Sequence, residues 1–279
     1  MTTTDLDRPT ANIANEYRYK RFTTGLLLRD LRFRKGAAEP GDTLPDFELI
    51  TTDGSSLVNE NVFGDRPVLF IFGSMTCPMT ASSAPSIQDL YDEFGDQVQF
   101  ILMYVREAHP GELFTQPESI EDKLESARAL KEFYGVEWTV AADNIEGDLH
   151  RALDPKPNAA YLVNSRGKIL FRSLWAADYN ALRQALDDAA AGRAMMNTQS
   201  NRLIGPVARA MGKVRQVMER GGPQAVSDLW RAGFPMALAG YVATFFKPLS
   251  PDNRGIAAVL TLAIGMFIFL GLLGVLVSR

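Results

Sequence analysis

The sequence predicts an α/β domain that is followed by a helical region and one transmembrane helix. Two nearly continuous apolar runs, residues 67–72 and 98–105, are typical of central strands that are covered on both faces. Residues 81–94 and 120–134 repeat apolar side chains every three or four positions, as amphipathic helices do. Residues 256–277 carry no charge, and a helix of that length, about 33 Å, crosses the hydrocarbon layer of a membrane.

Three further segments complete the order of the predicted elements. Residues 46–58 predict two short strands around an Asp-Gly dipeptide, which favours a β-hairpin. Residues 161–172 predict a second hairpin, and residues 178–191 predict a closing helix. Strand, helix, strand, helix, hairpin and helix is the order of the thioredoxin fold. We therefore expect a thioredoxin-like domain over residues 36–192, with an additional N-terminal β-hairpin.

Charge is distributed unevenly along the chain. Residues 1–35 carry eight basic against four acidic side chains, residues 36–200 twelve against 26, and residues 201–254 eight against three. An acidic body with basic flanks argues against nucleic acid as a partner and suits the surface of an anionic membrane. We expect four parts: a basic N-terminal arm (1–35), the thioredoxin-like domain (36–192), a basic amphipathic or interfacial helical segment (193–255) and a transmembrane anchor (256–277).

The anchor is expected to hold the chain in a membrane by a single C-terminal pass, with lipid as its partner. Basic residues precede it in segment 201–254, so the positive-inside rule places the thioredoxin-like domain on the cytoplasmic side. The N-terminus has neither the positive charge nor the apolar run of a secretion signal. A further apolar stretch, residues 234–246, is too short to span and suits either the membrane interface or packing beside the anchor.

Two basic segments have two interpretations each. Apolar side chains recur every three or four residues over 203–218, among arginines and lysines, which predicts a basic amphipathic helix. This helix either packs on the thioredoxin-like domain or lies on the membrane surface. The arm, residues 1–35, mixes aromatic and basic side chains and has the same two interpretations.

The chain contains one cysteine, Cys77. One cysteine excludes an internal disulfide, a cysteine-based zinc site and a CxxC dithiol pair. With only two histidines, His109 and His150, we do not expect a histidine-rich metal site either. We therefore expect no bound cofactor, and redox chemistry at Cys77 would take its electrons from an external thiol, such as a thioredoxin or a small thiol.

Cys77 follows the first central strand and stands at the start of the next helix. Unpaired backbone N–H groups and the helix dipole favour a thiolate at such a position. Pro78 suits the first helical turn, and Ser74 and Thr76 can add hydroxyl donors to the sulfur. The alternative is an inert, packed cysteine, since free cysteine is among the most buried residue types.

Glu107 and His109 directly follow the other central strand. The ends of adjacent parallel strands meet at one edge of an open sheet, so both side chains are expected near Cys77. His109 can donate or accept a proton, and Glu107 can orient it or bind a helix end. A capped or solvated histidine is the alternative interpretation.

The chain contains four segments in the order FGSMTCPMT, FILMYVREAHP, EDKLESARALKEFYG and YLVNSRGKILF. Together they resemble the iodothyronine deiodinase branch of the thioredoxin-like superfamily, over about residues 40–175. The resemblance implies that Cys77 stands where the family has selenocysteine or cysteine, and that Glu107 and His109 form a proton-handling network. The implied reaction is reductive dehalogenation: the sulfur takes up an iodonium equivalent, an acid protonates the aromatic carbon, and a separate thiol regenerates the enzyme.

Three positions depart from the family pattern. Met75 stands where the animal enzymes have a further cysteine, and the region where they have a second histidine reads Gln116-Pro117. Their arginine implicated in holding the hormone's carboxylate corresponds to about Ala159. The animal enzymes also have an N-terminal membrane segment, whereas the one predicted here is C-terminal. From the resemblance we therefore expect the same fold and a redox-active thiol in this chain, but not the same substrate.

Two classes of function are consistent with these features. The first is a membrane-anchored, single-cysteine oxidoreductase with Cys77 as the nucleophile, acting by dehalogenation or, as a thiol peroxidase, by peroxide reduction. The second is a non-catalytic redoxin-fold subunit, anchored in the membrane for the assembly or binding of a membrane-protein partner. The basic arm and segment 201–233 favour the second class, because both exceed what an enzyme core needs.

Overall fold

A computed structural model describes residues 17–277 of the chain, and its core is one mixed sheet. Within the described residues the strand order is β2-β1-β5-β4-β3-β6-β7-β8. The strands are β1 (Glu48–Thr51), β2 (Ser56–Val58), β3 (Val68–Gly73), β4 (Gln99–Tyr104), β5 (Thr139–Ala142), β6 (Ala160–Val163), β7 (Ile169–Ser173) and β8 (Gln199–Ser200). β1 and β2 pair antiparallel, and Gly54 in the turn between them has a φ of 92°.

The central strands β3, β4 and β5 are parallel, and β3 also pairs antiparallel with β6. Every residue of β3 is buried, as the apolar run predicts for a strand covered on both faces. Alternate side chains point to opposite faces of the sheet: Leu69 and Ile71 belong to one core, and Phe70 and Phe72 to another. The predicted thioredoxin-like α/β class is confirmed.

Helices cover both faces of this sheet. They are α2 (Thr24–Asp30), α3 (Asn59–Val62), α4 (Pro78–Phe94), α5 (Ile120–Tyr134), α6 (Asp148–Leu153), α7 (Tyr179–Ala190), α8 (Ile204–Gly221), α9 (Pro223–Ala232), α10 (Phe234–Ala243), the short 3-10 helix η1 (Thr244–Phe246) and α11 (Pro251–Val277). α4, α5 and α7 pack in the core that contains Leu69, and α6 packs in the core that contains Phe70. The sequence analysis missed β5 and α6, because such short elements have little periodicity.

Two helix starts have local causes. α4 begins at Pro78, earlier than its apolar pattern predicts, because proline suits the first helical position. α5 begins after Ser119, whose hydroxyl accepts a hydrogen bond from the backbone N–H of Asp122, and the Asp122 side chain caps the backbone N–H of Ser119 in return. α5 ends at Gly135, which has a left-handed backbone with a φ of 63°.

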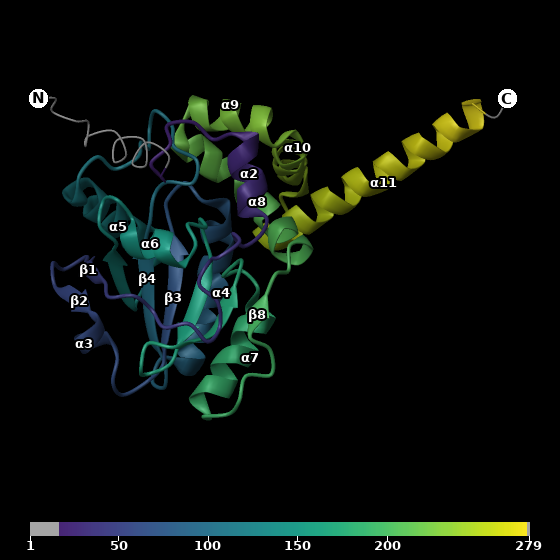
Figure 1. The fold of residues 1–279 in the computed structure, drawn as a ribbon. Helices are drawn as coiled ribbons and strands as arrows, with labels where there is room; N and C mark the ends of the chain where they lie inside the picture. The colour runs from purple at the N-terminus through teal and green to yellow at the C-terminus, as the bar shows by residue number, and fades with distance from the viewer. Residues whose placement is uncertain (1–16, 278–279) are drawn as a thin grey trace, which may run out of the picture.

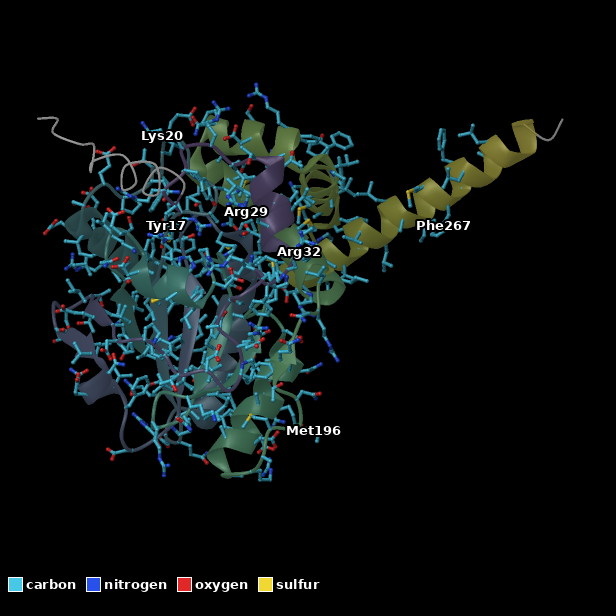
Figure 2. The ribbon with its side chains drawn as sticks, in the orientation of Figure 1. Tyr17, Lys20, Arg29, Arg32, Met196 and Phe267 are labelled. Carbon is cyan, nitrogen blue, oxygen red and sulfur yellow. The ribbon has the colours of Figure 1, made fainter. Side chains whose placement is uncertain are left out.

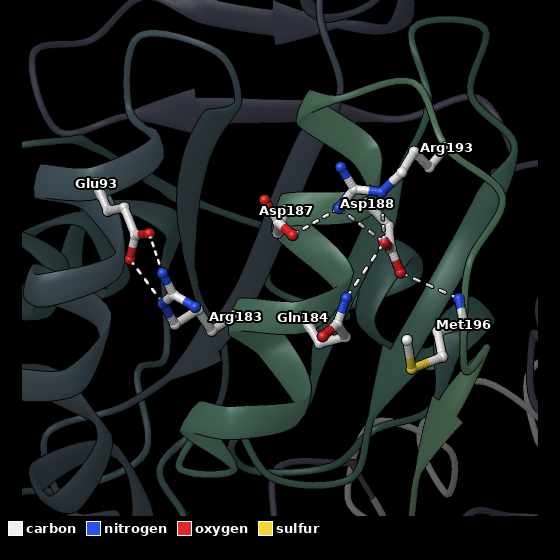
Figure 3. A network of polar contacts seen from close by, with 7 residues as sticks. All are labelled: Glu93, Arg183, Gln184, Asp187, Asp188, Arg193 and Met196. Atoms are coloured by element: carbon white, nitrogen blue, oxygen red, sulfur yellow. Dashed lines mark hydrogen bonds and ion pairs between the residues drawn. The ribbon is translucent and has the colours of Figure 1, made fainter.

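An ion-pair network joins α7 to α4 and holds the turn that follows α7 (Figure 3). Arg183 of α7 donates to both carboxylate oxygens of Glu93 in α4, at 2.9 and 2.5 Å. Asp188 accepts from Arg193 at 3.0 Å and from the backbone N–H of Met196 at 3.0 Å. These contacts fix the position of the closing helix, although exposed pairs of this kind add little stability.

A third core lies between the arm, the start of α4 and helices α8 to α10. The arm contributes Tyr19 and Phe22, and α8 contributes Met211, Val214 and Val217, all of them buried. Of the two interpretations of segment 203–218, the structure shows the packed one, because the apolar side of α8 faces the domain. The described part of the arm likewise buries its aromatic side chains in the protein.

α11 crosses α8 at close range and then projects away from the rest of the molecule (Figure 1). At the crossing, a Cβ on Gly255 would lie 2.2 Å from the carbonyl oxygen of Ala208, so only glycine fits there. Farther along, α11 is uncovered, as Phe267 shows in Figure 2. In the described chain one helix segment, Pro251–Leu273, is long and apolar enough to cross a membrane.

We expect the substitution Gly255→Ala to loosen the crossing of α8 and α11, because the added methyl group meets backbone atoms rather than a flexible side chain. Overpacking of this kind costs about 1–3 kcal/mol, which a thermal unfolding curve of the full chain in detergent micelles detects. Gly265→Ala is the matched control in the same helix, since nothing lies within 4 Å of its Cβ position. Equal unfolding midpoints for the two variants would contradict the close crossing.

Candidate functional site

The candidate site lies at the C-terminal ends of β3 and β4, where Gly73 pairs with Tyr104. Because these strands are parallel neighbours, the loops that follow them meet at one edge of the sheet. The structure brings all five predicted side chains into these two loops, and all are buried: Ser74, Thr76, Cys77, Glu107 and His109.

Glu107 is the polar centre of the two loops and is fully buried. One carboxylate oxygen accepts from the backbone N–H of Thr76 at 2.9 Å and from the Thr76 hydroxyl at 2.6 Å. The other oxygen accepts from the hydroxyl of Tyr104. Burial raises the pKa of the Glu107 carboxyl group, and these donors oppose the rise without cancelling it. Glu107 therefore ties the loop before Cys77 to the end of β4.

The hydroxyl groups of Ser74 and Thr76 bind the neighbouring loop, which differs from the expectation that they serve the sulfur. The Ser74 hydroxyl accepts from the backbone N–H of Ala108 at 3.3 Å. The Thr76 hydroxyl donates to Glu107 and accepts from the backbone N–H of His109 at 3.1 Å. Both side chains therefore hold the two loops together.

The side chain that does lower the pKa of the Cys77 thiol is the Thr80 hydroxyl, one turn into α4, although the Cys77 side chain makes no capping hydrogen bond. Cys77 occupies the N-cap position of this helix, and a cap side chain faces the residue three positions ahead. Thr80 is the last residue of the CPMT motif, where a dithiol enzyme has its second cysteine. The helix start alone could have identified it from the sequence.

Cys77 is 1% exposed in the structure. Burial raises the pKa of its thiol from about 9 to about 11. The Thr80 hydroxyl and the backbone N–H groups of Thr80 and Met79 lower the pKa, as expected at a helix start, but their effect is smaller. In this conformation Cys77 is a protonated thiol at neutral pH.

We expect iodoacetamide to alkylate Cys77 in the folded chain at pH 8 roughly 100-fold more slowly than an exposed cysteine, because only the thiolate reacts. The rate should rise with pH up to about 11, the folded pKa. Because this pKa is raised, the group stabilises the fold below about pH 9, and that contribution disappears as the pH rises through about 11.

The mass of the alkylated chain measures this rate directly, since Cys77 is the only cysteine. The chain unfolded in urea is the control and should react like free cysteine. Rapid alkylation of the folded chain at pH 8 would show that Cys77 is a thiolate, in contradiction to its burial.

His109 lies on the other side of the same site. Its ring packs on Phe22 with a centroid distance of 4.1 Å. Its Nδ1 atom is buried and has no hydrogen-bond partner among residues 17–277. Burial lowers the pKa of the imidazole to about 3, so the ring is neutral at pH 7. The unpartnered nitrogen is open to a hydrogen bond from a molecule in the site, while the low pKa makes the buried ring a weak base.

Cys77 and His109 line one small, largely apolar cavity of about 60 Å³. Phe22 of the arm, Met211 of α8 and Met236 of α10 form part of its cover. The cavity holds a few water-sized molecules, whereas sites for larger ligands have volumes of about 300–1,000 Å³. A small oxidant therefore fits beside the sulfur, while an aromatic substrate requires the cover to move.

Three residues that the sequence analysis did not place in the site support it: Tyr104, Gln116 and Arg220. Gln116 accepts from the backbone N–H of Glu107 and donates to its carbonyl oxygen, both at 2.9 Å. Arg220 of α8 donates to the carbonyl oxygen of Met75 at 3.1 Å, a contact between segments far apart in the sequence.

The second histidine, His150, lies outside the site. Its ring bonds to the Tyr17 hydroxyl and to the carbonyl oxygen of Lys156, both at 2.8 Å, and burial lowers its pKa well below the ordinary value. Over residues 17–277, no group of three or more His, Cys, Asp or Glu side chains is arranged to bind a metal ion. His150 therefore takes no part in the candidate site.

Comparison with solved structures gives weak similarity only. The crystal structure of an uncharacterized conserved protein from Geobacillus kaustophilus aligns with a TM-score of 0.47 and 19% identity. The alignment covers 58% of this chain and 87% of that protein.

Comparison of this sequence with known protein sequences finds relatives in one family. Human thyroxine 5-deiodinase is 31% identical over 113 residues, which are 37% of this chain and 37% of the human protein. The type II iodothyronine deiodinase of Fundulus heteroclitus is 26% identical over 131 residues, 42% of this chain and 49% of that protein. The chain thus spans half or less of the length of these two relatives. The family model for iodothyronine deiodinase matches residues 12–187, more than half of the chain. This chain belongs to the iodothyronine deiodinase family.

Proposed function

We propose that the chain is a membrane-anchored, single-cysteine oxidoreductase in which the Cys77 sulfur is the nucleophile. One observation carries the proposal: Cys77 and His109, whose Nδ1 atom has no partner in the described chain, line the same small cavity. Membership of the deiodinase family supports thiol-dependent reduction as the reaction class. Glu107, Thr76 and Ser74 act as positioning residues, because their hydrogen bonds join the two loops.

The first half-reaction needs a base, because the thiol is protonated at neutral pH. His109 relays the proton from the thiol to the leaving group as the sulfur forms its new bond, because a buried ring with a pKa of about 3 does not hold the proton as an imidazolium. With a peroxide, the O–O bond breaks, Cys77 becomes a sulfenic acid, and the leaving oxygen receives the proton as water or alcohol. With a halogenated aromatic, the carbon–halogen bond breaks, the halogen stays on the sulfur, and the aromatic carbon receives the proton.

The second half-reaction takes its electrons from outside the chain, since the sequence has no other cysteine. An external thiol attacks the oxidised sulfur, releases water or hydrogen halide, and leaves a mixed disulfide. A second thiol then restores the Cys77 thiol and leaves as a disulfide. A thioredoxin or a small thiol suits this role, and no bound cofactor is required.

We also propose that α11 anchors the chain in a membrane by a single pass, with the thioredoxin-like domain on the cytoplasmic side. The Pro251–Leu273 segment supports this, because it is apolar and almost entirely uncovered. Exposed aromatic side chains precede it, at Trp230, Phe234, Tyr241 and Phe245, and aromatic residues are enriched at membrane interfaces. The excess of basic residues before the anchor supports the orientation.

A second candidate is a non-catalytic redoxin-fold subunit that binds a membrane-protein partner. The burial of Cys77, at 1% exposed, favours this candidate, as does the small size of its cavity. In that case Cys77 is a packing residue, and the covering helices α8 to α10 serve the partner rather than a substrate.

The test uses the full, reduced chain in detergent micelles with dithiothreitol as the external thiol. Hydrogen peroxide and 2,6-diiodophenol are supplied in separate reactions, and peroxide consumption and iodide release are measured. Turnover above that of dithiothreitol alone supports the oxidoreductase and identifies its chemistry. Absence of turnover with both, together with no sulfenic acid on Cys77 after peroxide treatment, supports the subunit.

A further inference from the structure

A second cavity, of about 750 Å³, lies between the end of the arm and the segment that follows α6. Seven basic side chains line it: Arg29, Arg32, Arg34, Lys35, Arg106, Arg151 and Lys156. Its lining also includes two carboxylates, Asp30 and Asp154, so basic side chains outnumber acidic ones among the lining residues. Figure 2 labels Tyr17, Arg29 and Arg32, which belong to this lining. We call it the basic cavity.

We propose that the basic cavity binds a small molecule with two or more phosphoryl or carboxylate groups. This inference goes beyond the proposed function and does not depend on the chemistry of Cys77. The volume lies in the range of about 300–1,000 Å³ that is usual for small-molecule sites. Guanidinium groups bind phosphoryl and carboxylate oxygens through paired hydrogen bonds, so the lining matches this ligand class.

Arg106 gives the strongest indication that the basic cavity binds an anion. It is 6% exposed, and its Nη2 atom donates to the carbonyl oxygen of Pro155 at 3.0 Å. Its Nε and Nη1 atoms are buried and have no hydrogen-bond partner within the described residues. The guanidinium stacks on the rings of Tyr17 and Tyr19, at 5.4 and 5.0 Å from their centroids, and no carboxylate of residues 17–277 forms an ion pair with it. Because a buried, unpaired charge is costly, an anion in the cavity would stabilise Arg106.

The two carboxylates of the cavity do not neutralise it. Asp154 accepts from the backbone N–H of Arg34 at 2.7 Å and forms an ion pair with Lys156 at 3.5 Å. Its negative charge is therefore balanced by Lys156 and leaves the other basic side chains of the cavity without a partner carboxylate from Asp154. Asp30 is buried, and burial raises the pKa of its carboxyl group to about 6; at pH 7 it is largely ionised and offsets part of the charge of Arg106, with which it forms no ion pair. Arg32, Lys35 and Arg151 form no ion pair with any residue in the described part of the chain. Their charges are therefore available to a ligand.

Asp30 also lines the cavity of Cys77, so the two cavities are neighbours that share a wall. The basic cavity is more than ten times larger than the cavity beside the sulfur, at about 750 against about 60 Å³. It is therefore the place in this part of the molecule with room for a metabolite-sized ligand.

The test is isothermal titration calorimetry of the full chain in neutral detergent micelles, with tripolyphosphate as the phosphoryl probe and citrate as the carboxylate probe. We expect at least one probe to bind, with an affinity that falls as sodium chloride rises from 50 to 500 mM. The stronger probe identifies the preferred group. Absence of binding by both probes at 50 mM salt overturns the proposal.

Charge reversal distinguishes a built site from general attraction. Arg32→Glu should weaken binding roughly tenfold or more, because it removes one charge-assisted contact and adds a repulsive charge. Arg166→Glu is the matched control: it makes the same change of net charge at an exposed turn outside the cavity. Equal weakening by both variants overturns the proposal, since binding would then follow net charge alone. Arg32 is exposed, so its replacement should leave the fold intact.

Discussion

Replacement of Cys77 by serine is expected to abolish turnover of peroxide or halogenated phenol, by roughly a thousandfold or more, because it removes the only sulfur nucleophile. A serine hydroxyl does not take up an oxygen or halogen atom and pass it to an external thiol. The expected cost in stability is small, about 1 kcal/mol, since the two side chains are nearly isosteric. The measurement is the rate of peroxide consumption or iodide release by the full chain with dithiothreitol.

Met79→Leu is the matched control for Cys77→Ser. Met79 lines the same cavity, and leucine preserves its volume and apolar character, so turnover should remain within a few fold of the original. An active Cys77→Ser variant would contradict the assignment of the nucleophile. If Cys77→Ser and Met79→Leu both lose turnover to the same extent relative to the unmodified chain, the shape of the cavity rather than the sulfur controls the reaction.

Replacement of Glu107 by alanine is expected to lower the free energy of unfolding by about 3–5 kcal/mol. The substitution leaves three buried donors without an acceptor: the backbone N–H and the hydroxyl of Thr76, and the hydroxyl of Tyr104. It also removes the connection between the loop before Cys77 and the end of β4. Chemical denaturation of the full chain in detergent micelles measures the change.

Two further variants make this prediction specific. Glu107→Gln should cost less than Glu107→Ala, because its amide oxygen can still accept from Thr76. Glu132→Ala is the control on the exposed side of α5 and should change stability by no more than about 0.5 kcal/mol. If Glu107→Ala unfolds at the same denaturant concentration as Glu132→Ala, the buried carboxylate does not hold the two loops together.

The elements with strong local patterns could be predicted from the sequence. β3 and β4 are long apolar runs, and α5 has both a regular apolar stripe and capping residues, so their hydrophobic order alone identifies them. The position of the candidate site followed from the same pattern, since Cys77 and His109 come directly after neighbouring strands. The four-residue β5 and the six-residue α6 lack such patterns and were missed.

The contacts of the site needed the tertiary structure. Proximity in sequence suggested Ser74 and Thr76 as partners of the sulfur, whereas the structure joins both hydroxyls to the 107–109 loop. The hydroxyl that lowers the pKa of the Cys77 thiol is that of Thr80. A hydroxyl group bonds to whichever acceptor or donor the packed chain places before it, and sequence distance does not determine that choice.

By itself, the sequence determined the thioredoxin-like order, the family, the single thiol at a helix start and the long apolar C-terminal helix. The tertiary structure decided the state of that thiol. α8 covers the site through Arg220 and Met211. Desolvation by this burial raises the pKa of the Cys77 thiol more than the N–H groups at the start of α4 lower it. The tertiary structure also gathered arginines and lysines of three separate segments around one cavity. The physical reason is the same in both cases: local hydrophobic periodicity specifies elements, whereas desolvation and charge clustering depend on which elements pack against one another.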